Sequence, residues 1–169
     1  MNKSNPVPGN KSAIRHLKDL YLLGSEQKHP SIPAYARFAP NYTDKTANGL
    51  TRCIIDFINL SGGQAERINN TGRQIDSRQT VQDVLGHTRT IGSIKWIKGT
   101  GTNGTADISA TIKGRSVKVE VKIGKDKQSD FQIKYQFNIE RAGGIYFVAK
   151  DFESFLNWYK LKFSSDENR

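Results

Sequence analysis

The chain has 169 residues, 36% of them hydrophobic, which suits one domain with a substantial core. A formal net charge of +10 and a pI near 9.8 favour a polyanionic partner, most simply nucleic acid, although a basic ribosome-like or chaperone-like protein would carry similar charge. The single cysteine, Cys53, excludes an internal disulfide, and three scattered histidines give no zinc-site spacing. With no long apolar run and no signal-peptide core, the sequence predicts a cytoplasmic protein without membrane contact.

Residues 1–45 are predicted to form a basic N-terminal extension around one short helix. Prolines interrupt this stretch, and the helix is expected near residues 12–23, with Ala13, Leu17 and Leu20 on its apolar side and Gly24 as its stop. The lysines and arginines of this helix have two interpretations, DNA contact and a solvated helix face. Three roles of the extension stay open: packing on the core, contact with DNA and oligomerisation.

The next segment, residues 46–60, has the apolar spacing of a helix. Leu50, Ile54 and Phe57 recur on one side, Cys53 belongs to the same stripe as a small buried hydrophobe, and the glycines that follow end the helix. A strand carrying Glu66 is expected next. Residues 46–163 are therefore predicted to form the core of the protein.

Residues 71–98 are predicted to contain one helical turn over residues 80–85 and a strand through Ile91, Ile94, Trp96 and Ile97 that leads toward the candidate site around Asp107. The segment is basic, which suggests contact with a phosphate chain; surface charges on a loop explain it equally. The glycines of residues 99–104 match G-x-G-x-x-G, but a period-two run follows where a dinucleotide site needs a helix. We expect these glycines to let the backbone approach a ligand beside Asp107.

Residues 104–123 alternate apolar and polar side chains in two arms, which predicts a β-hairpin. A turn at Lys113-Gly114 sets Asp107 opposite Glu120, and two opposed carboxylates favour an offsetting cation such as Mg²⁺. Lys122 follows Glu120 on the same face. Two alternatives remain: a solvated face neutralised by lysines, or a turn shifted by one residue that pairs Asp107 with Lys122 as a salt bridge.

The C-terminal part is predicted as helix, strand and helix. Ser129 and Gln132 form a capping box for a helix that ends near residue 142, and residues 145–149 form an apolar strand covered on both faces. Asp151 begins a last amphipathic helix with Phe152 and Phe155 inward, and residues 164–169 are expected to be a flexible tail.

Three of these motifs together resemble a known family. Gly104 to Asp107, then Glu120-Val121-Lys122, then Gln132 are similar to the G-x-x-D … E-x-K … Q pattern of the PD-(D/E)XK nuclease superfamily, in particular its VRR-NUC branch. The resemblance extends to residues 62–72 and 143–149. It implies an α/β fold with a restriction-endonuclease-like αβββαβ core, in which helices flank a mixed central sheet.

The resemblance also implies a Mg²⁺- or Mn²⁺-dependent DNA endonuclease. Asp107, Glu120 and the backbone carbonyl of Val121 would hold the cation, while Lys122 and Gln132 would complete the catalytic group. The family usually carries a glutamate near the start of the first core helix, and this chain has Asn48 at the nearest matching position. The candidates for a third acid are Asp44, Asp56 and Glu66.

The residues predicted to contact DNA are Arg73, Lys95, Lys98, Lys125, Lys127 and Lys134. Small members of the family resemble Holliday-junction resolvases and are often phage-encoded, which suggests branched or flapped DNA as substrate, a homodimer, no nucleotide cofactor, and a bacterial or phage-infected host cell. Two alternatives are kept: a catalytically degenerate nucleic-acid-binding module, and a basic structural or packaging protein.

Overall fold

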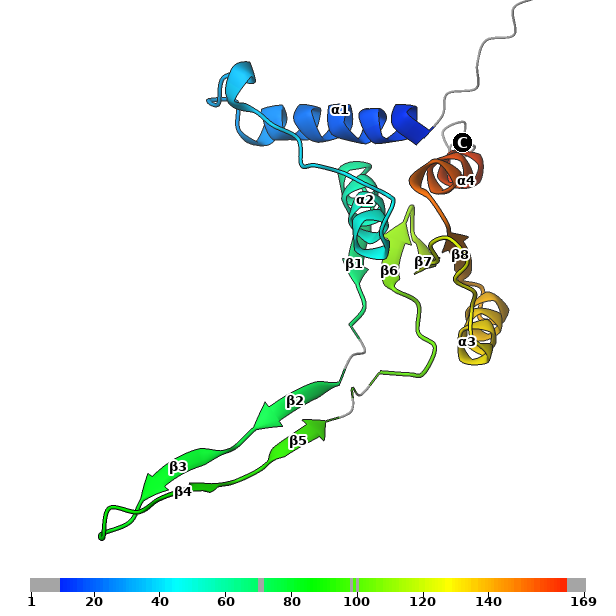
Figure 1. The fold of residues 1–169 in the computed structure, drawn as a ribbon. Helices are drawn as coiled ribbons and strands as arrows, with labels where there is room; N and C mark the ends of the chain where they lie inside the picture. Colours follow the sequence, from blue (N-terminus) through cyan, green and yellow to red (C-terminus); the bar gives the residue numbers. More distant parts are fainter. Residues whose placement is uncertain (1–9, 70–71, 98, 100, 164–169) are drawn as a thin grey trace, which may run out of the picture.

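The computed structural model describes residues 10–69, 72–97, 99 and 101–163. Its centre is a four-stranded mixed sheet in the order β1-β6-β7-β8, whose strands are β1 (Gln64–Arg67), β6 (Ile108–Ile112), β7 (Arg115–Val121) and β8 (Ile145–Ala149). β1 and β7 run antiparallel to β6, and β8 runs parallel to β7. The helices are α1 (Asn10–Lys28), α2 (Ala47–Leu60), α3 (Asp130–Arg141) and α4 (Phe152–Phe163), with a short 3₁₀ turn at Ala34–Ala36 (Figure 1). The expected mixed α/β class is confirmed.

The hydrophobic core lies between α2 and one face of the sheet. Thr46 caps α2 by accepting the Gly49 backbone N–H, and the buried stripe of α2 meets Ile108 and Val119 of the hairpin. Cys53 lies in this core as predicted, and burial raises the pKa of its thiol to about 12. The other face of β7 is thereby left to carry polar side chains.

α1 is longer than predicted and joins this core. It continues through Gly24 to Lys28, so the predicted stop is wrong. A Cβ atom at Gly24 would lie 3.0 Å from the Leu60 side chain, so close contact with α2 favours glycine there in spite of its low helix propensity. Ala13 and Leu17 are buried in the same cluster as the residues of α2. The helix crosses above α2 and α4 (Figure 1).

Residues 72–97 form a long two-stranded antiparallel ribbon that projects away from the core (Figure 1). It consists of β2 (Arg73–Asp76) with β5 (Ile94–Ile97) and of β3 (Gln79–Gln82) with β4 (Thr88–Ile91). The helical turn predicted over residues 80–85 is therefore wrong. Asp83 and His87 close a turn in which Gly86 takes a positive φ of 85°, and this turn favours a hairpin.

The C-terminal elements follow the prediction. Ser129 and Gln132 form the capping box of α3, and Asp151 accepts the Ser154 backbone N–H at the start of α4. Phe152, Phe155 and Leu156 of α4 are buried. The predicted tail, residues 164–169, lies outside the described residues. Within the described part of the chain, no helix has the length and apolarity needed to cross a membrane.

Candidate active site

The β6–β7 hairpin has the predicted register. Lys113 and Gly114 form its turn with φ of 46° and 75°, and Ile108 pairs with Val119. One step beyond that pair, Asp107 and Glu120 come to the same end of the two strands. The alternative turn, which would pair Asp107 with Lys122, is contradicted by this register.

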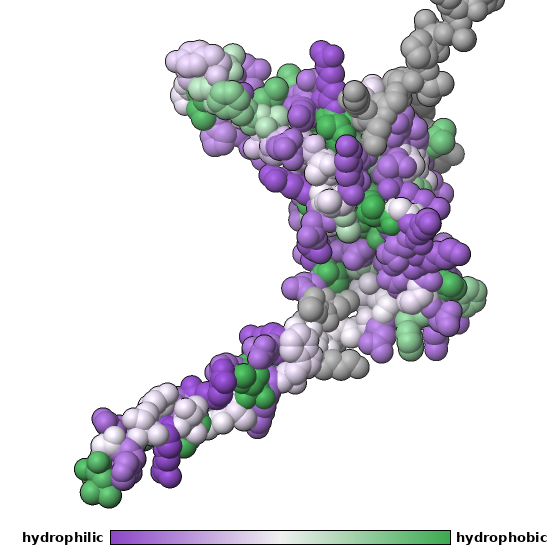
Figure 2. Space-filling model, in the orientation of Figure 1, coloured by the Kyte–Doolittle hydropathy of each residue, from purple (hydrophilic) through white to green (hydrophobic). Residues whose placement is uncertain are grey.

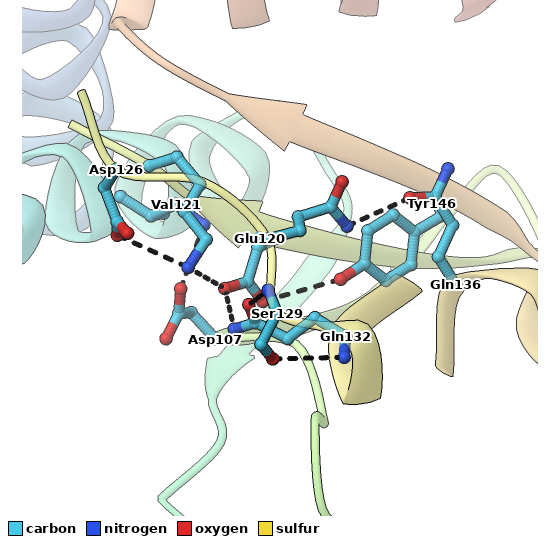
Figure 3. A network of polar contacts seen from close by, with 10 residues as sticks. Asp107, Glu120, Val121, Asp126, Ser129, Gln132, Gln136 and Tyr146 are labelled. Carbon is cyan, nitrogen blue, oxygen red and sulfur yellow. Dashed lines mark hydrogen bonds and ion pairs between the residues drawn. The ribbon is translucent and has the colours of Figure 1, made fainter. Parts of the chain in front are cut away.

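Glu120 is the centre of a polar network on the face of β7 away from the core (Figure 3). Glu120 is 1% exposed, and each of its two carboxylate oxygens contacts a polar side chain. Oε1 accepts a hydrogen bond from Gln132 Nε2 and lies 3.3 Å from Lys122 Nζ, and Oε2 accepts the Tyr146 hydroxyl at 3.5 Å. Three elements, β7, α3 and β8, therefore fix one carboxylate.

The carboxylate of Asp107 acts on the carboxyl group of Glu120. Burial, and then the negative charge of Asp107, raise the pKa of Glu120 to about 7, against the opposing effect of Lys122. Asp107 Oδ2 accepts the Val121 backbone N–H at 2.9 Å, which holds its side chain across the strand pair. A cation bound beside Glu120 would oppose both effects, because it favours the charged form of the carboxyl group.

Lys122 lies between two acids. Its ammonium is 3.3 Å from Glu120 Oε1 and 3.3 Å from Asp126 Oδ2, and its residue is 8% exposed. Burial alone would lower the pKa of this ammonium, but the two ion pairs outweigh burial and raise it. Lys118, four residues before Lys122 on the same face of β7, donates a hydrogen bond to the Ser109 hydroxyl instead. Of the two lysines considered as neutralising charges, only Lys122 contacts Glu120.

Gln132 combines the two roles between which the sequence left a choice. Its Oε1 accepts the Ser129 backbone N–H at 2.9 Å in the capping box, while its Nε2 donates to Glu120. Gly104 helps to place it: φ is +78°, and a Cβ atom there would overlap the backbone carbonyl of Phe131. The glycines were expected to approach a ligand, but Gly104 instead lets its loop approach the first turn of α3.

Tyr146 and Asp126 belong to the site and were missed in the sequence. Tyr146 lies in an apolar run from which the sequence predicted only a covered strand. The residue is 8% exposed. Its burial, and to a smaller extent the negative charge of Glu120, raise the pKa of the hydroxyl. Asp126 lies four residues after Lys122 in a polar connection, and the Lys-x-x-x-Asp spacing was the available signal.

The candidate third acids have other contacts. Asp44 is buried and accepts the Phe152 backbone N–H at 3.1 Å, and Asp56 accepts the Tyr42 hydroxyl at 2.8 Å and pairs with Arg52 at 3.6 Å. Glu66 and Asn48 are exposed, on β1 and in the first turn of α2. Among the described residues, no three His, Cys, Asp or Glu side chains gather as a metal-binding group.

The donor atoms of the site nevertheless suit a hard divalent cation. Mg²⁺ is commonly bound through one or two carboxylates while it keeps several waters, and it prefers oxygen ligands. Asp107 and Glu120 supply two carboxylates at adjoining strand ends, next to the Val121 backbone. The Val121 contact that the structure shows is made by its backbone N–H, so the two carboxylates are the ligands that the geometry offers to Mg²⁺ or Mn²⁺.

The basic residues predicted to contact DNA fall into two groups. Lys125, Lys127 and Lys134 are exposed on the loop before α3 and on α3 itself, near Gln132 in the chain. Arg73 and Lys95 are exposed on the ribbon, and Lys98 lies outside the described residues. Between the base of the ribbon and the first turn of α3 is a cavity of about 410 Å³, lined by Gly72, Gly104, Phe131 and Gln132 among others.

No protein-family model matches this chain, and a search of curated proteins gives no match to it. The functional assignment therefore depends on the residues and their geometry.

Proposed function

We propose that this protein is a Mg²⁺- or Mn²⁺-dependent nuclease that hydrolyses phosphodiester bonds in DNA, with an αβββαβ core of the restriction-endonuclease-like type. The observation that supports this most directly is the arrangement of Asp107, Glu120 and Lys122. Two acids meet at one strand end, and a cationic side chain lies 3.3 Å from the buried one. A cation held by paired acids and an adjacent ammonium can each stabilise the charge that develops during phosphodiester hydrolysis.

Asp107, Glu120 and the Val121 carbonyl would hold the cation. When bound, a divalent cation at such a site polarises the phosphate and lowers the pKa of a coordinated water. Gln132 and Tyr146 keep the Glu120 carboxylate in one orientation by hydrogen bonds to its two oxygens. Gln132 is in this respect a positioning residue.

Lys122 would stabilise negative charge rather than accept a proton. Its ion pairs with Glu120 and Asp126 keep the ammonium protonated, because either acid alone would favour the charged form. A fixed ammonium next to the scissile phosphate lowers the free energy of the transition state, in which charge accumulates on the phosphoryl oxygens. A role for Lys122 as general base is disfavoured for the same reason.

The substrate is proposed to be DNA because the chain has a net charge of +10. Branched, flapped and four-way DNA are the structures suggested by the family resemblance, and a homodimer would suit a two-fold symmetric junction.

The test is cleavage of labelled linear, flapped and four-way DNA in Mg²⁺ or EDTA. Lys122→Ala should lower the rate by at least about 100-fold, the usual effect of removing one preorganised charge stabiliser. Lys118→Ala is the matched control, since that lysine lies on the same strand face but bonds to Ser109, and it should cleave like the wild type. Cleavage by Lys122→Ala at the wild-type rate would show that the activity belongs to a contaminant.

A second candidate is a nucleic-acid-binding module that has lost catalysis. Asn48 is exposed at the family's glutamate position, and among the described residues no third acid joins Asp107 and Glu120 in a metal-binding group; both observations favour this candidate. Such a protein would bind DNA but show no cation-dependent cleavage. A basic structural or packaging protein would need no acid pair, and Mn²⁺ binding by calorimetry that is lost in Asp107→Asn would argue against it.

A further inference from the structure

The ribbon is the largest part of the molecule that the proposed site does not use. None of the residues 72–97 belongs to the buried core, and large apolar side chains are exposed along it. A two-stranded ribbon alone is marginally stable in water, so its shape and composition call for a binding partner.

The two faces of the ribbon differ in charge. Strand pairing has the same offset in both pieces, with Arg73 opposite Ile97 and Gln79 opposite Ile91, so alternate residues share a face within each piece. Between the pieces, the Ser77 backbone N–H donates to the Ser93 carbonyl, which keeps the same offset. One face, here called the basic face, carries three cross-strand pairs of a basic and a β-branched residue, together with the neutral pair Gln79–Ile91: the three are Arg73–Ile97, Lys95–Ile75 and Arg89–Val81. Each basic side chain stands beside an aliphatic one, with no acid opposite it.

The opposite face is neutral. Its one arginine, Arg78, is bound by Asp76 at 2.7 Å. The cross-strand pairs of this face are Gln74–Trp96, Asp76–Ile94, Thr80–Thr90 and Gln82–Thr88. The chain therefore places its unneutralised ribbon charges on one side, which is the side suited to a polyanion.

The tip of the ribbon is apolar. Val84 is fully exposed and Leu85 is 78% exposed, and Figure 2 shows a hydrophobic end on an otherwise mixed ribbon. Proteins that bend DNA place apolar side chains between base pairs from the minor groove, where they kink the duplex. Basic residues along a ribbon that ends in exposed aliphatic side chains are the composition that this binding mode requires.

The length of the ribbon fits a duplex. At about 3.3 Å per residue, the strand from Arg73 to Asp83 spans roughly 35 Å, close to the 34–36 Å of one turn of DNA. The base of the ribbon adjoins the cavity beside Gln132, so the ribbon begins next to the candidate active site.

We propose that residues 72–97 are a DNA-binding arm that follows one turn of duplex next to the cleavage site, with the basic face on the phosphates and Val84 and Leu85 inserted in a groove. This inference rests on the proposed function and specifies its substrate: the DNA on the ribbon side of the cleaved bond would be double-stranded. A second copy of the chain packed on the ribbon is the competing occupant, and the basic side chains of this face, which have no acid opposite them, favour a polyanion instead.

The experiment is duplex binding by fluorescence anisotropy in EDTA, over salt from about 50 to 200 mM. Arg73→Ala, Arg89→Ala and Lys95→Ala combined should lower the affinity at least about tenfold and make the salt dependence shallower by about 3 in log–log slope. Arg78→Ala, on the neutral face, should bind within about twofold of the wild type, which a general charge effect would not allow. Affinity should also rise with duplex length up to about 10 base pairs on one side of the site.

Val84→Ser with Leu85→Ser tests the tip. DNA bending, read from energy transfer between dyes at the duplex ends, should be lost while most of the affinity remains. Three results would each overturn the inference. The triple variant could bind duplex as tightly as the wild type, Arg78→Ala could lose as much affinity as the triple variant, or the wild type could show no affinity for duplex. A wild-type dimer that the tip variant dissociates without change in DNA affinity would also overturn it.

Cleavage in Mg²⁺, measured separately, distinguishes this inference from the proposed function. Wild-type protein that binds through the basic face but does not cleave would refute the nuclease and support the arm. Wild-type protein that cleaves, with ribbon variants that bind duplex equally well, would refute the arm alone.

Discussion

The molecule contains two antiparallel hairpins whose residues differ sharply in burial. Glu120, near the end of β7, is 1% exposed, whereas Val84, at the ribbon tip, is fully exposed. Glu120 is held by side chains from α3 and β8 as well as by its own strand. Residues of the ribbon are held by one partner strand. Substitutions near Glu120 should therefore alter stability and chemistry together, while substitutions on the ribbon should alter binding alone.

Gly104→Ala should show the largest effect on stability, because it forces a side chain into the contact between the glycine loop and α3. The added Cβ would overlap the Phe131 backbone, in addition to the strain of a φ of +78°. We expect the free energy of unfolding to fall by about 2–4 kcal/mol in urea titrations. The contact of Gln132 with Glu120 should be disturbed at the same time.

Gly114→Ala is the matched control for this prediction. Gly114 has a φ of 75°, but a Cβ atom there meets nothing within 4 Å. The loss should be about 1 kcal/mol, from backbone strain alone. Equal losses in the two variants would mean that the loop does not contact α3 as described.

The second prediction concerns pH and Glu120. Its pKa is about 7 in the folded protein and 4.5 for the ordinary side chain, so the folded state binds more protons between these values. Stability should therefore fall as pH rises from about 4.5 to about 7, by about 1–3 kcal/mol. Glu120→Gln cannot titrate, so its unfolding free energy should lack this decrease.

The readout is the difference between the two pH profiles from urea titrations, because other groups contribute equally to both. Glu66→Gln on β1, an exposed position, should keep the wild-type profile. A Glu120→Gln profile parallel to that of the wild type would mean that Glu120 is not buried beside Asp107 as described.

These differences also explain what the sequence could predict. The hairpin register, and with it the placement of Asp107 opposite Glu120, could be predicted from residues 104–123, and the capping box from Ser129 and Gln132. Alternating apolar residues, turn residues and capping residues are local signals in the sequence. Tyr146 could not be assigned to the site in this way, since its partner Glu120 lies on another strand, 26 residues away. Gly24 misled the α1 prediction, because its contact with Leu60 is tertiary.

The ribbon was missed for a related reason. Its strands are only four residues long and carry no buried face, so the alternation that marks a core strand is weak in Gln79–Gln82. The turn residues Asp83 and Gly86 were the remaining signal. The basic charges of this segment were recognised, but their restriction to one face depends on the pairing.

The smallest effect is expected from removal of the ribbon itself. Arg73 and Ile97 pair across its base, so residues 74–96 can be replaced by a short glycine turn without moving either end. Because no residue of the ribbon belongs to the buried core, the unfolding free energy of the remainder should change by less than about 1 kcal/mol. Urea unfolding of the shortened chain measures this. A loss of several kcal/mol would mean that the ribbon stabilises the sheet, and the division between a rigid site and an independent binding arm would have to be abandoned.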